Sequence, residues 1–180
     1  MRKSKGICGV GKKLPETNIT GCKAYTTWVN MINRCYSGRE AFKSYVKTEV
    51  CEEWKQFEVF RGWFYAQDWE GKDLDKDIIG DGLLYSPQTC AMVPRYLNNF
   101  LTKTSGKPYG SRVKRNGVWV YITLVRNPLT GERERLGVFH TKEEAYQMWK
   151  IRKCAIAQEV AVSVKDERVA EAIRKKFSGV

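Results

Sequence analysis

The chain has 180 residues, of which 42% are hydrophobic and 12% aromatic, so a packed core is expected and a disordered chain is excluded. Lys and Arg number 32 against 20 Asp and Glu, which gives a formal net charge of +12. Such a surplus attracts polyanions, and at this size it favours nucleic acid over an anionic membrane or an acidic protein. No apolar run reaches the length of a signal peptide or a transmembrane helix. We therefore expect a cytoplasmic protein without a membrane partner.

The cysteines do not have the spacing of a metal or redox motif. No two of the six are separated by only two residues, and His140 is the only histidine. A Cys/His zinc site therefore has almost no nitrogen ligand to use. We expect reduced, partly buried thiols at six positions: Cys8, Cys22, Cys35, Cys51, Cys90 and Cys154.

The first part of the chain is predicted to be an arm followed by helices. Residues 1–22 are basic and glycine-rich without periodicity, which predicts an arm. Apolar residues spaced by three, four and seven predict an amphipathic helix over 23–36, and residues 37–47 then form a loop. A second helix is expected over 51–66. Its large rings repeat at three or four and are expected in the core: Trp54, Phe57, Phe60, Trp63 and Phe64.

The middle of the chain alternates strand and turn signals. Glycines bracket two predicted strands, Asp73–Ile79 and Leu83–Pro94, and a short helix is expected over Arg95–Leu101. The polar and basic residues Thr102–Lys107 mark a boundary between two halves.

The second half carries three strand signals in close succession. The first strand is expected over Tyr109–Arg115, and Asn116-Gly117 then gives a tight hairpin. The second is expected over Val118–Arg126. Pro and Gly within 127–131 suit a turn, after which the third strand covers Glu132–Phe139.

Two helices are expected after the sheet. Thr141 and Glu144 form a capping box that starts a helix reaching about Val162. Ser163 and Asp166 resemble a second cap, and a last helix follows over Glu167–Phe177. The chain is therefore predicted to be α+β, with a three-stranded antiparallel sheet packed on an α-helix. The expected parts are 1–22, 23–101, 107–162 and 163–180.

The basic residues of the three strands are predicted to lie on the uncovered face of this sheet. A helix covers one face, so the other face is polar or occupied by a partner. A sheet of this width fits the major groove of DNA, where Arg reads guanine and Arg or Lys also holds phosphates. The alternative is an ordinary solvated face, which the scarcity of Asp and Glu on these strands disfavours. Both faces of the second strand are largely apolar, so the sequence does not determine which of them meets the DNA. The predicted contact residues are Arg112, Lys114, Arg115, Arg126, Arg133 and Arg135.

Residues 109–160 resemble the Apetala-two (ethylene-response-factor) DNA-binding domain. The shared pattern comprises Tyr109-Gly110, Trp119, Arg126-Asn127-Pro128, Leu136-Gly137-Val138-Phe139, Thr141 and Glu143-Glu144-Ala145-Tyr146. The resemblance implies a sheet laid in the major groove, with the basic strand residues as contacts. The more apolar second strand departs from that pattern.

Residues 73–101 resemble the ββα-metal finger of HNH endonucleases in a divergent, phage-type form. Upstream positions Trp28, Arg34-Cys35-Tyr36 and Trp54 add to this resemblance. Phage homing endonucleases join such a finger to an Apetala-two domain in the same order. The resemblance implies an α+β fold that contains a ββα-metal-like finger, and a Mg or Mn cofactor if the finger is active. By position, Asp75 is the first metal ligand and Asn98 or Asn99 the second, while Lys76 occupies the general-base position and Thr89 that of the orienting amide.

Lys76 is a poor base beside two carboxylates, which favour its charged form, so a phosphate contact suits it better. In a purely structural role, Asp75 holds a turn. Tyr85, Cys90, Val93 and Leu97 then fill a small core. This role is favoured slightly over catalysis.

Three hypotheses follow. The first is a double-stranded DNA-binding protein of phage type, derived from an HNH homing endonuclease whose nuclease activity is lost or weakened, in the cytoplasm of the bacterial host. The second is an active Mg- or Mn-dependent DNA nicking endonuclease. The third is a phage inhibitor that binds a host protein.

Overall fold

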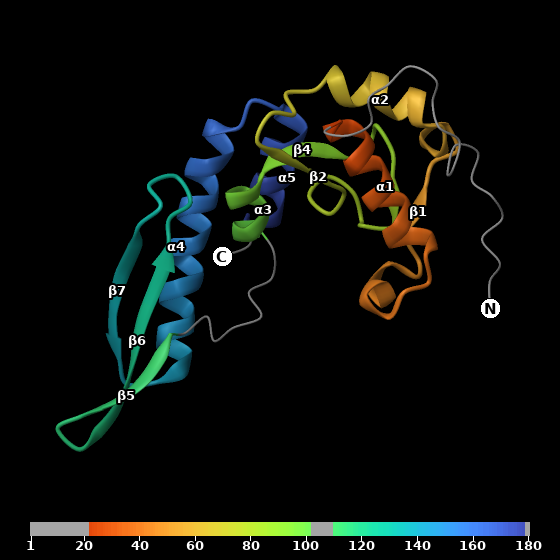
Figure 1. Ribbon diagram of the computed structural model, residues 1–180. Helices are drawn as coiled ribbons and strands as arrows, with labels where there is room; N and C mark the ends of the chain where they lie inside the picture. Colours follow the sequence, from red (N-terminus) through yellow and green to blue (C-terminus); the bar gives the residue numbers. More distant parts are fainter. Residues whose placement is uncertain (1–21, 102–109, 179–180) are drawn as a thin grey trace. The chain divides into compact units, whose positions relative to one another are not determined.

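The computed structural model describes residues 22–101 and 110–178 (Figure 1). The chain divides into two compact units, residues 1–95 and 96–180, which we describe separately. Both helices and strands are present, with a three-stranded antiparallel sheet and a C-terminal helix, so the α+β prediction is confirmed. Residues 1–21 of the predicted arm (1–22) and the boundary stretch 102–107 lie outside the described residues.

Within its described residues, the first unit contains four short helices and four short strands that form two pairs. Its elements are α1 (Lys23–Tyr36), η1 (Glu40–Tyr45), β1 (Glu49–Val50), η2 (Glu53–Lys55), α2 (Phe57–Tyr65), β2 (Lys72–Asp75), β3 (Leu84–Tyr85) and β4 (Ala91–Pro94). The strand β1 pairs in parallel with β3, and β2 pairs antiparallel with β4.

The first helix is confirmed, but the second is interrupted. α1 covers the predicted 23–36 and buries Trp28, Met31 and Ile32. Over 51–66 a 3-10 turn precedes α2, and Gln56 between them is extended. The indole Nε1 of Trp28 donates to the carbonyl of Trp54 at 2.7 Å. This core hydrogen bond uses a carbonyl group that a continuous helix would bond four residues later.

The two predicted middle strands are shorter than expected. β2 ends at Asp75 because the carboxylate of that residue accepts the backbone N–H groups of Asp77 and Ile78 and turns the chain. The predicted strand 83–94 is two strands, β3 and β4, separated by a loop. β3 lies between β2 and β4 in the chain, and β4 is followed by α3 (Arg95–Leu101), which matches its predicted bounds.

The second unit is built on a sheet of order β5 (Ser111–Arg115), β6 (Val118–Arg126) and β7 (Arg133–Phe139). Asn116 and Gly117 have φ values of 48° and 80°, as the predicted tight turn requires. Thr123 lies opposite Gly137 while Leu124 lies opposite Arg135, so Leu136 is an extra residue in β7. The φ of 146° at Gly137 suits this bulge.

Two helices complete the second unit: α4 (Lys142–Ser163) and α5 (Glu167–Lys176). The predicted capping box starts α4, since the Thr141 hydroxyl accepts from the N–H of Glu144 and the Glu144 carboxylate accepts from the N–H of Thr141. Asp166 caps α5, whereas Ser163 is the last residue of α4. Within the described ranges, no helix is both long enough and apolar enough to span a membrane.

Candidate nucleic-acid interface

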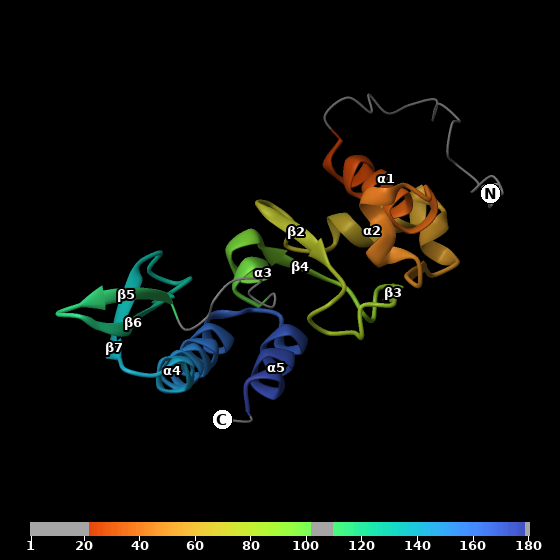
Figure 2. The same ribbon diagram turned by 90° about the horizontal axis from the view of Figure 1, so that it is seen from below.

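Helix α4 covers one face of the sheet (Figure 2). Arg152 of α4 forms two hydrogen bonds to the carboxylate of Glu134 in β7, at 2.6 and 2.9 Å. Glu134 lies opposite Val125, and Val125 and Thr123 are both buried. Residues that lie directly opposite share a face, and alternate residues along a strand share a face. The covered face is therefore the one that carries Tyr121, Thr123 and Val125. Helix α4 does not cover the opposite face, which we call the open face.

Three of the predicted arginines lie together on the open face. Arg133 lies directly opposite Arg126, and Arg135 lies opposite Leu124. All three guanidinium groups are on exposed residues. The only carboxylate in the three strands is that of Glu134, which points to α4. The open face of β5–β7 is therefore purely cationic in its charge.

Apolar side chains accompany these arginines. Leu124 and Val138 are exposed, and Val138 lies opposite Ile122. Strand alternation places Val138 with Ile122 and Leu124 on the open face, so this apolar side chain is not part of the core. Val120 is on the same face and is buried.

The β5–β6 hairpin divides the remaining cations between two faces. Arg112 lies opposite Tyr121 and Lys114 opposite Trp119, so these two cations share the face that α4 covers further along the sheet. Arg115 lies opposite Val118, on the open face. The prediction of a single surface for all the basic strand residues is therefore wrong. The two-residue turn sets the register, and that register puts Arg112 and Lys114 with Trp119.

The hairpin tip nevertheless extends past the start of α4 (Figure 1). Arg112, Lys114, Arg115, Val118 and Trp119 are all exposed there. Arg112 and Lys114 are therefore accessible although they are on the helix side of the sheet.

The six predicted contact residues have no carboxylate partner within the part of the chain that the structure describes. Other arginines of this unit do: Arg152 pairs with Glu134 and Glu159, and Arg174 pairs with Glu167. The cations of the sheet are thus available to an external anion, in contrast to those of the helices.

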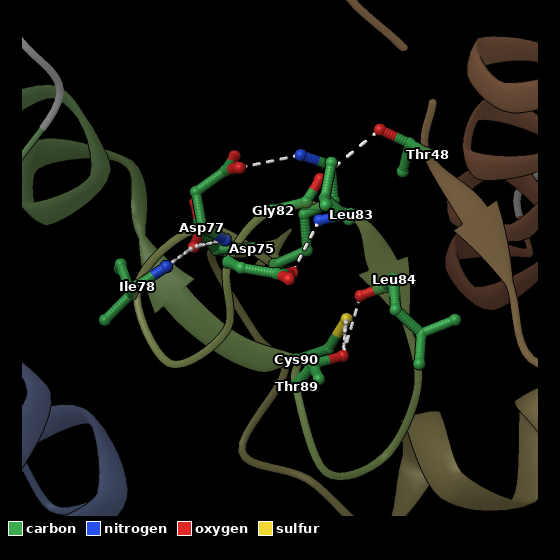
Figure 3. A network of polar contacts seen from close by, with 11 residues as sticks. Thr48, Asp75, Asp77, Ile78, Gly82, Leu83, Leu84, Thr89 and Cys90 are labelled. Carbon is green, nitrogen blue, oxygen red and sulfur yellow. Dashed lines mark hydrogen bonds and ion pairs between the residues drawn. The ribbon is translucent and has the colours of Figure 1, made fainter. Parts of the chain in front are cut away.

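The predicted metal ligand Asp75 holds a turn instead (Figure 3). One of its oxygens accepts from the backbone N–H groups of Asp77 and Ile78 at 2.8 and 2.9 Å. Asp75 is only 6% exposed, and burial raises the pKa of its carboxyl above the usual 3.8, while the two N–H groups oppose this rise. This is the structural role that the sequence predicted for Asp75.

Lys76, at the position of the general base, is buried as well. The residue is 6% exposed, and its ammonium lies 2.7 Å from the Asp77 carboxylate. The same ammonium lies 5.1 Å from the ring centre of Tyr45 and 5.7 Å from that of Tyr85. The prediction that Lys76 contacts phosphate is therefore wrong in this structure, because its charge is buried and neutralised by Asp77.

Thr89, at the position of the orienting amide, closes the loop between β3 and β4. Its hydroxyl donates to the carbonyl of Leu84 at 2.7 Å and accepts from the N–H of Ser86 at 3.1 Å. The four residues predicted to fill a small core, Tyr85, Cys90, Val93 and Leu97, are all buried.

A metal centre is not formed by the donors described in the structure. Residues 22–101 and 110–178 contain no group of three or more His, Cys, Asp or Glu side chains able to hold an ion. Asn98 and Asn99, the other predicted ligands, lie in α3. Since one carboxylate that already holds a turn is a poor fit for Mg²⁺ or Mn²⁺, we derive no metal-dependent step.

Sequence reasoning did not assign a role to Trp119 or Lys153. Trp119 is exposed next to Arg112, and its position two residues after the Asn116-Gly117 turn was the available signal. Lys153 is 7% exposed among the rings of Phe100, Trp149 and Phe177, with its ammonium 4.8–6.0 Å from their centres. Nothing in the sequence marks Lys153, because the rings come from three separate helical segments.

Comparisons with models of protein families, with curated proteins and with solved structures gave no match to this chain. The HNH-like and Apetala-two-like resemblances therefore remain predictions, and the functional argument rests on the sheet itself.

Proposed function

We propose that this protein binds double-stranded DNA through the open face of the β5–β7 sheet. The observation that carries the proposal is the set Arg126, Arg133 and Arg135: three exposed guanidinium groups, on one face, without a carboxylate partner among the described residues. Guanidinium groups bind phosphates and guanine edges with paired hydrogen bonds. A three-stranded sheet presents such groups to the major groove.

The net charge of +12 supports the same proposal. Charge of this size raises the concentration of a polyanion near the whole protein, and the arginines of the open face then determine where the polyanion is held. The exposed Leu124 and Val138 beside the arginines add apolar contact for sugars or thymine methyl groups. The HNH-like and phage-type resemblances agree with a DNA substrate, and nuclease activity is not part of this proposal.

The test is a titration of a fluorescent duplex at several salt concentrations. We expect the logarithm of the affinity to fall linearly with the logarithm of the salt concentration, with a slope of about 0.9 for each phosphate contact. The double variant Arg133→Ala/Arg135→Ala should bind more weakly and have a shallower slope. The matched control is Arg174→Ala/Lys175→Ala on α5, which removes the same charge away from the sheet.

Equal losses in the two double variants would attribute binding to net charge alone and overturn the proposed face. A native protein without measurable DNA affinity at low salt would overturn the function. In that case, a host protein partner becomes the better hypothesis.

A further inference from the structure

Trp119 is the single tryptophan that is largely exposed, and all six tryptophans lie in the described ranges. Its side chain is 47% exposed, whereas Trp28 and Trp54 are fully buried. It lies in the strand that follows the turn at Asn116 and Gly117, and the neighbouring Val118 is exposed too. A large apolar ring in water at a hairpin tip indicates a surface that has a binding partner.

Two cations surround this ring. The guanidinium carbon of Arg112 lies 4.5 Å from the centre of the Trp119 ring, and the Lys114 ammonium lies 6.0 Å from it. Lys114 is directly opposite Trp119 in the strand register. Neither cation has a carboxylate partner within the described part of the chain. We call these three residues the Trp119 cluster.

The chemistry of the Trp119 cluster suits a nucleobase with an exposed face. Proteins that hold single strands combine aromatic rings, on which bases stack, with cations that hold the backbone. A base inside an intact duplex has both faces covered by its neighbours, so it cannot stack on an indole without unstacking. An unpaired base avoids most of that cost.

The shape of the hairpin supports this assignment. Its tip extends past the start of helix α4 (Figures 1 and 2). Side chains on both faces of the hairpin are exposed, since Val118 and Arg115 lie on the face opposite to Trp119. A narrow two-stranded tip enters a groove or an opened step, where an apolar side chain acts as a wedge.

We propose that the Trp119 cluster stacks on an unpaired base beside the duplex, so that the protein prefers DNA with a bulged or otherwise unpaired nucleotide over an intact duplex. This inference rests on the proposed function, because the open face of the sheet holds the duplex part. Trp119 supplies the stacking ring. Arg112 and Lys114 hold the phosphates that flank the unpaired nucleotide.

The test compares two duplexes of the same length and flanking sequence, one intact and one with a single bulged 2-aminopurine. We expect the native protein to bind the bulged duplex about 5- to 150-fold more tightly, and to quench the 2-aminopurine fluorescence by stacking. The variant Trp119→Ala should lose the preference and the quenching while keeping its affinity for the intact duplex. Trp119→Phe should keep part of both, and Val118→Ala should keep all.

The outcomes separate the two proposals. Equal affinity of the native protein for both duplexes, or a preference that survives in Trp119→Ala, overturns the role of the Trp119 cluster and leaves the proposed function in place. A preference that persists in Arg133→Ala/Arg135→Ala, with weaker binding to both duplexes, supports both proposals. Absence of binding to any DNA overturns both.

Discussion

Arg126 and Arg133 lie directly opposite each other on the neighbouring strands β6 and β7. Like charges in this position repel, and the described residues offer neither of them a carboxylate. The repulsion lowers the stability of the sheet, and an external anion bound between the two guanidinium groups would relieve it. This relationship is therefore better explained by binding than by folding.

The first prediction is that Arg126→Ala lowers the DNA affinity without lowering the stability of the protein. Removing one guanidinium relieves the repulsion, so the free energy of unfolding should rise or stay within about 0.5 kcal/mol of the native value. The affinity for duplex DNA should fall by about 1–3 kcal/mol if the side chain reads a base. Urea unfolding and a DNA titration measure the two quantities. A clear loss of stability without loss of affinity would contradict the interpretation.

The second prediction concerns Asp75 and separates its structural role from metal binding. An amide oxygen accepts the same two N–H groups, so Asp75→Asn should keep the turn, whereas Asp75→Ala should lose about 1–3 kcal/mol of stability. The pKa of Asp75 is raised, so the native state holds this proton more tightly than the unfolded chain does. The carboxylate therefore reduces stability above its native pKa, and Asp75→Asn should be at least as stable as the native protein at neutral pH.

The same pair of variants tests the nicking alternative. Supercoiled plasmid is incubated with native protein and with Asp75→Asn, with and without Mg²⁺ or Mn²⁺. We expect no metal-dependent nicking by either protein. Nicking by the native protein that Asp75→Asn abolishes would show that Asp75 serves a metal and would contradict the structural role.

The third prediction concerns the pH dependence of the contact between the sheet and α4. Hydrogen bonds from Arg152, and then from Asn127, hold the pKa of Glu134 below its ordinary value of 4.5. A lowered carboxyl pKa stabilises the fold above 4.5, and this contribution disappears as the pH falls through the native pKa. Glu134→Gln should therefore cost about 1 kcal/mol at neutral pH and nothing in strong acid. Denaturant unfolding across this range measures the difference, and a pH-independent cost would contradict it.

The fourth prediction concerns the buried lysine. Burial, and then repulsion from Lys176, lowers the pKa of Lys153 from its ordinary 10.5. The native state therefore binds this proton less tightly than the unfolded chain, so stability rises with pH between the native pKa and 10.5. Lys153→Met should be more stable at neutral pH by about 1 kcal/mol. The gain should shrink toward alkaline pH in thermal unfolding, and a constant gain would exclude titration of Lys153 as its cause.

Local signals predicted the second unit well. Three signals there depend on only a few neighbouring residues: the strand alternation, the Asn116-Gly117 turn and the Thr141 capping box. The structure confirms the turn, the cap and the bounds of β6. The hairpin register also follows from a two-residue turn, so the shared face of Lys114 and Trp119 was available from the sequence. The bulge at Leu136 was not, because it depends on how β7 pairs with β6.

Long-range contacts explain most of the differences in the first unit. The second helix is interrupted at the extended Gln56, next to the hydrogen bond from Trp28 to the Trp54 carbonyl, and no local pattern indicates this bond. The strands β1 and β3 have two residues each, which is too short to show the alternation of apolar and polar residues that predicts a strand. They also pair across a long separation in the chain. Lys76 was expected at the surface as a charged residue, but Tyr45, Tyr85 and Asp77 provide a buried place for it.

The central claim is that the open face of the sheet holds the DNA, and the arginine side-chain N–H resonances of the protein test it most directly. An NMR titration with an intact duplex should shift the Nε–H signals of Arg126, Arg133 and Arg135. The Nε–H signals of Arg152 and Arg174 should not shift, because carboxylates already bind these two guanidinium groups. Shifts confined to arginines of the first unit, with the three sheet arginines unchanged, would contradict the account.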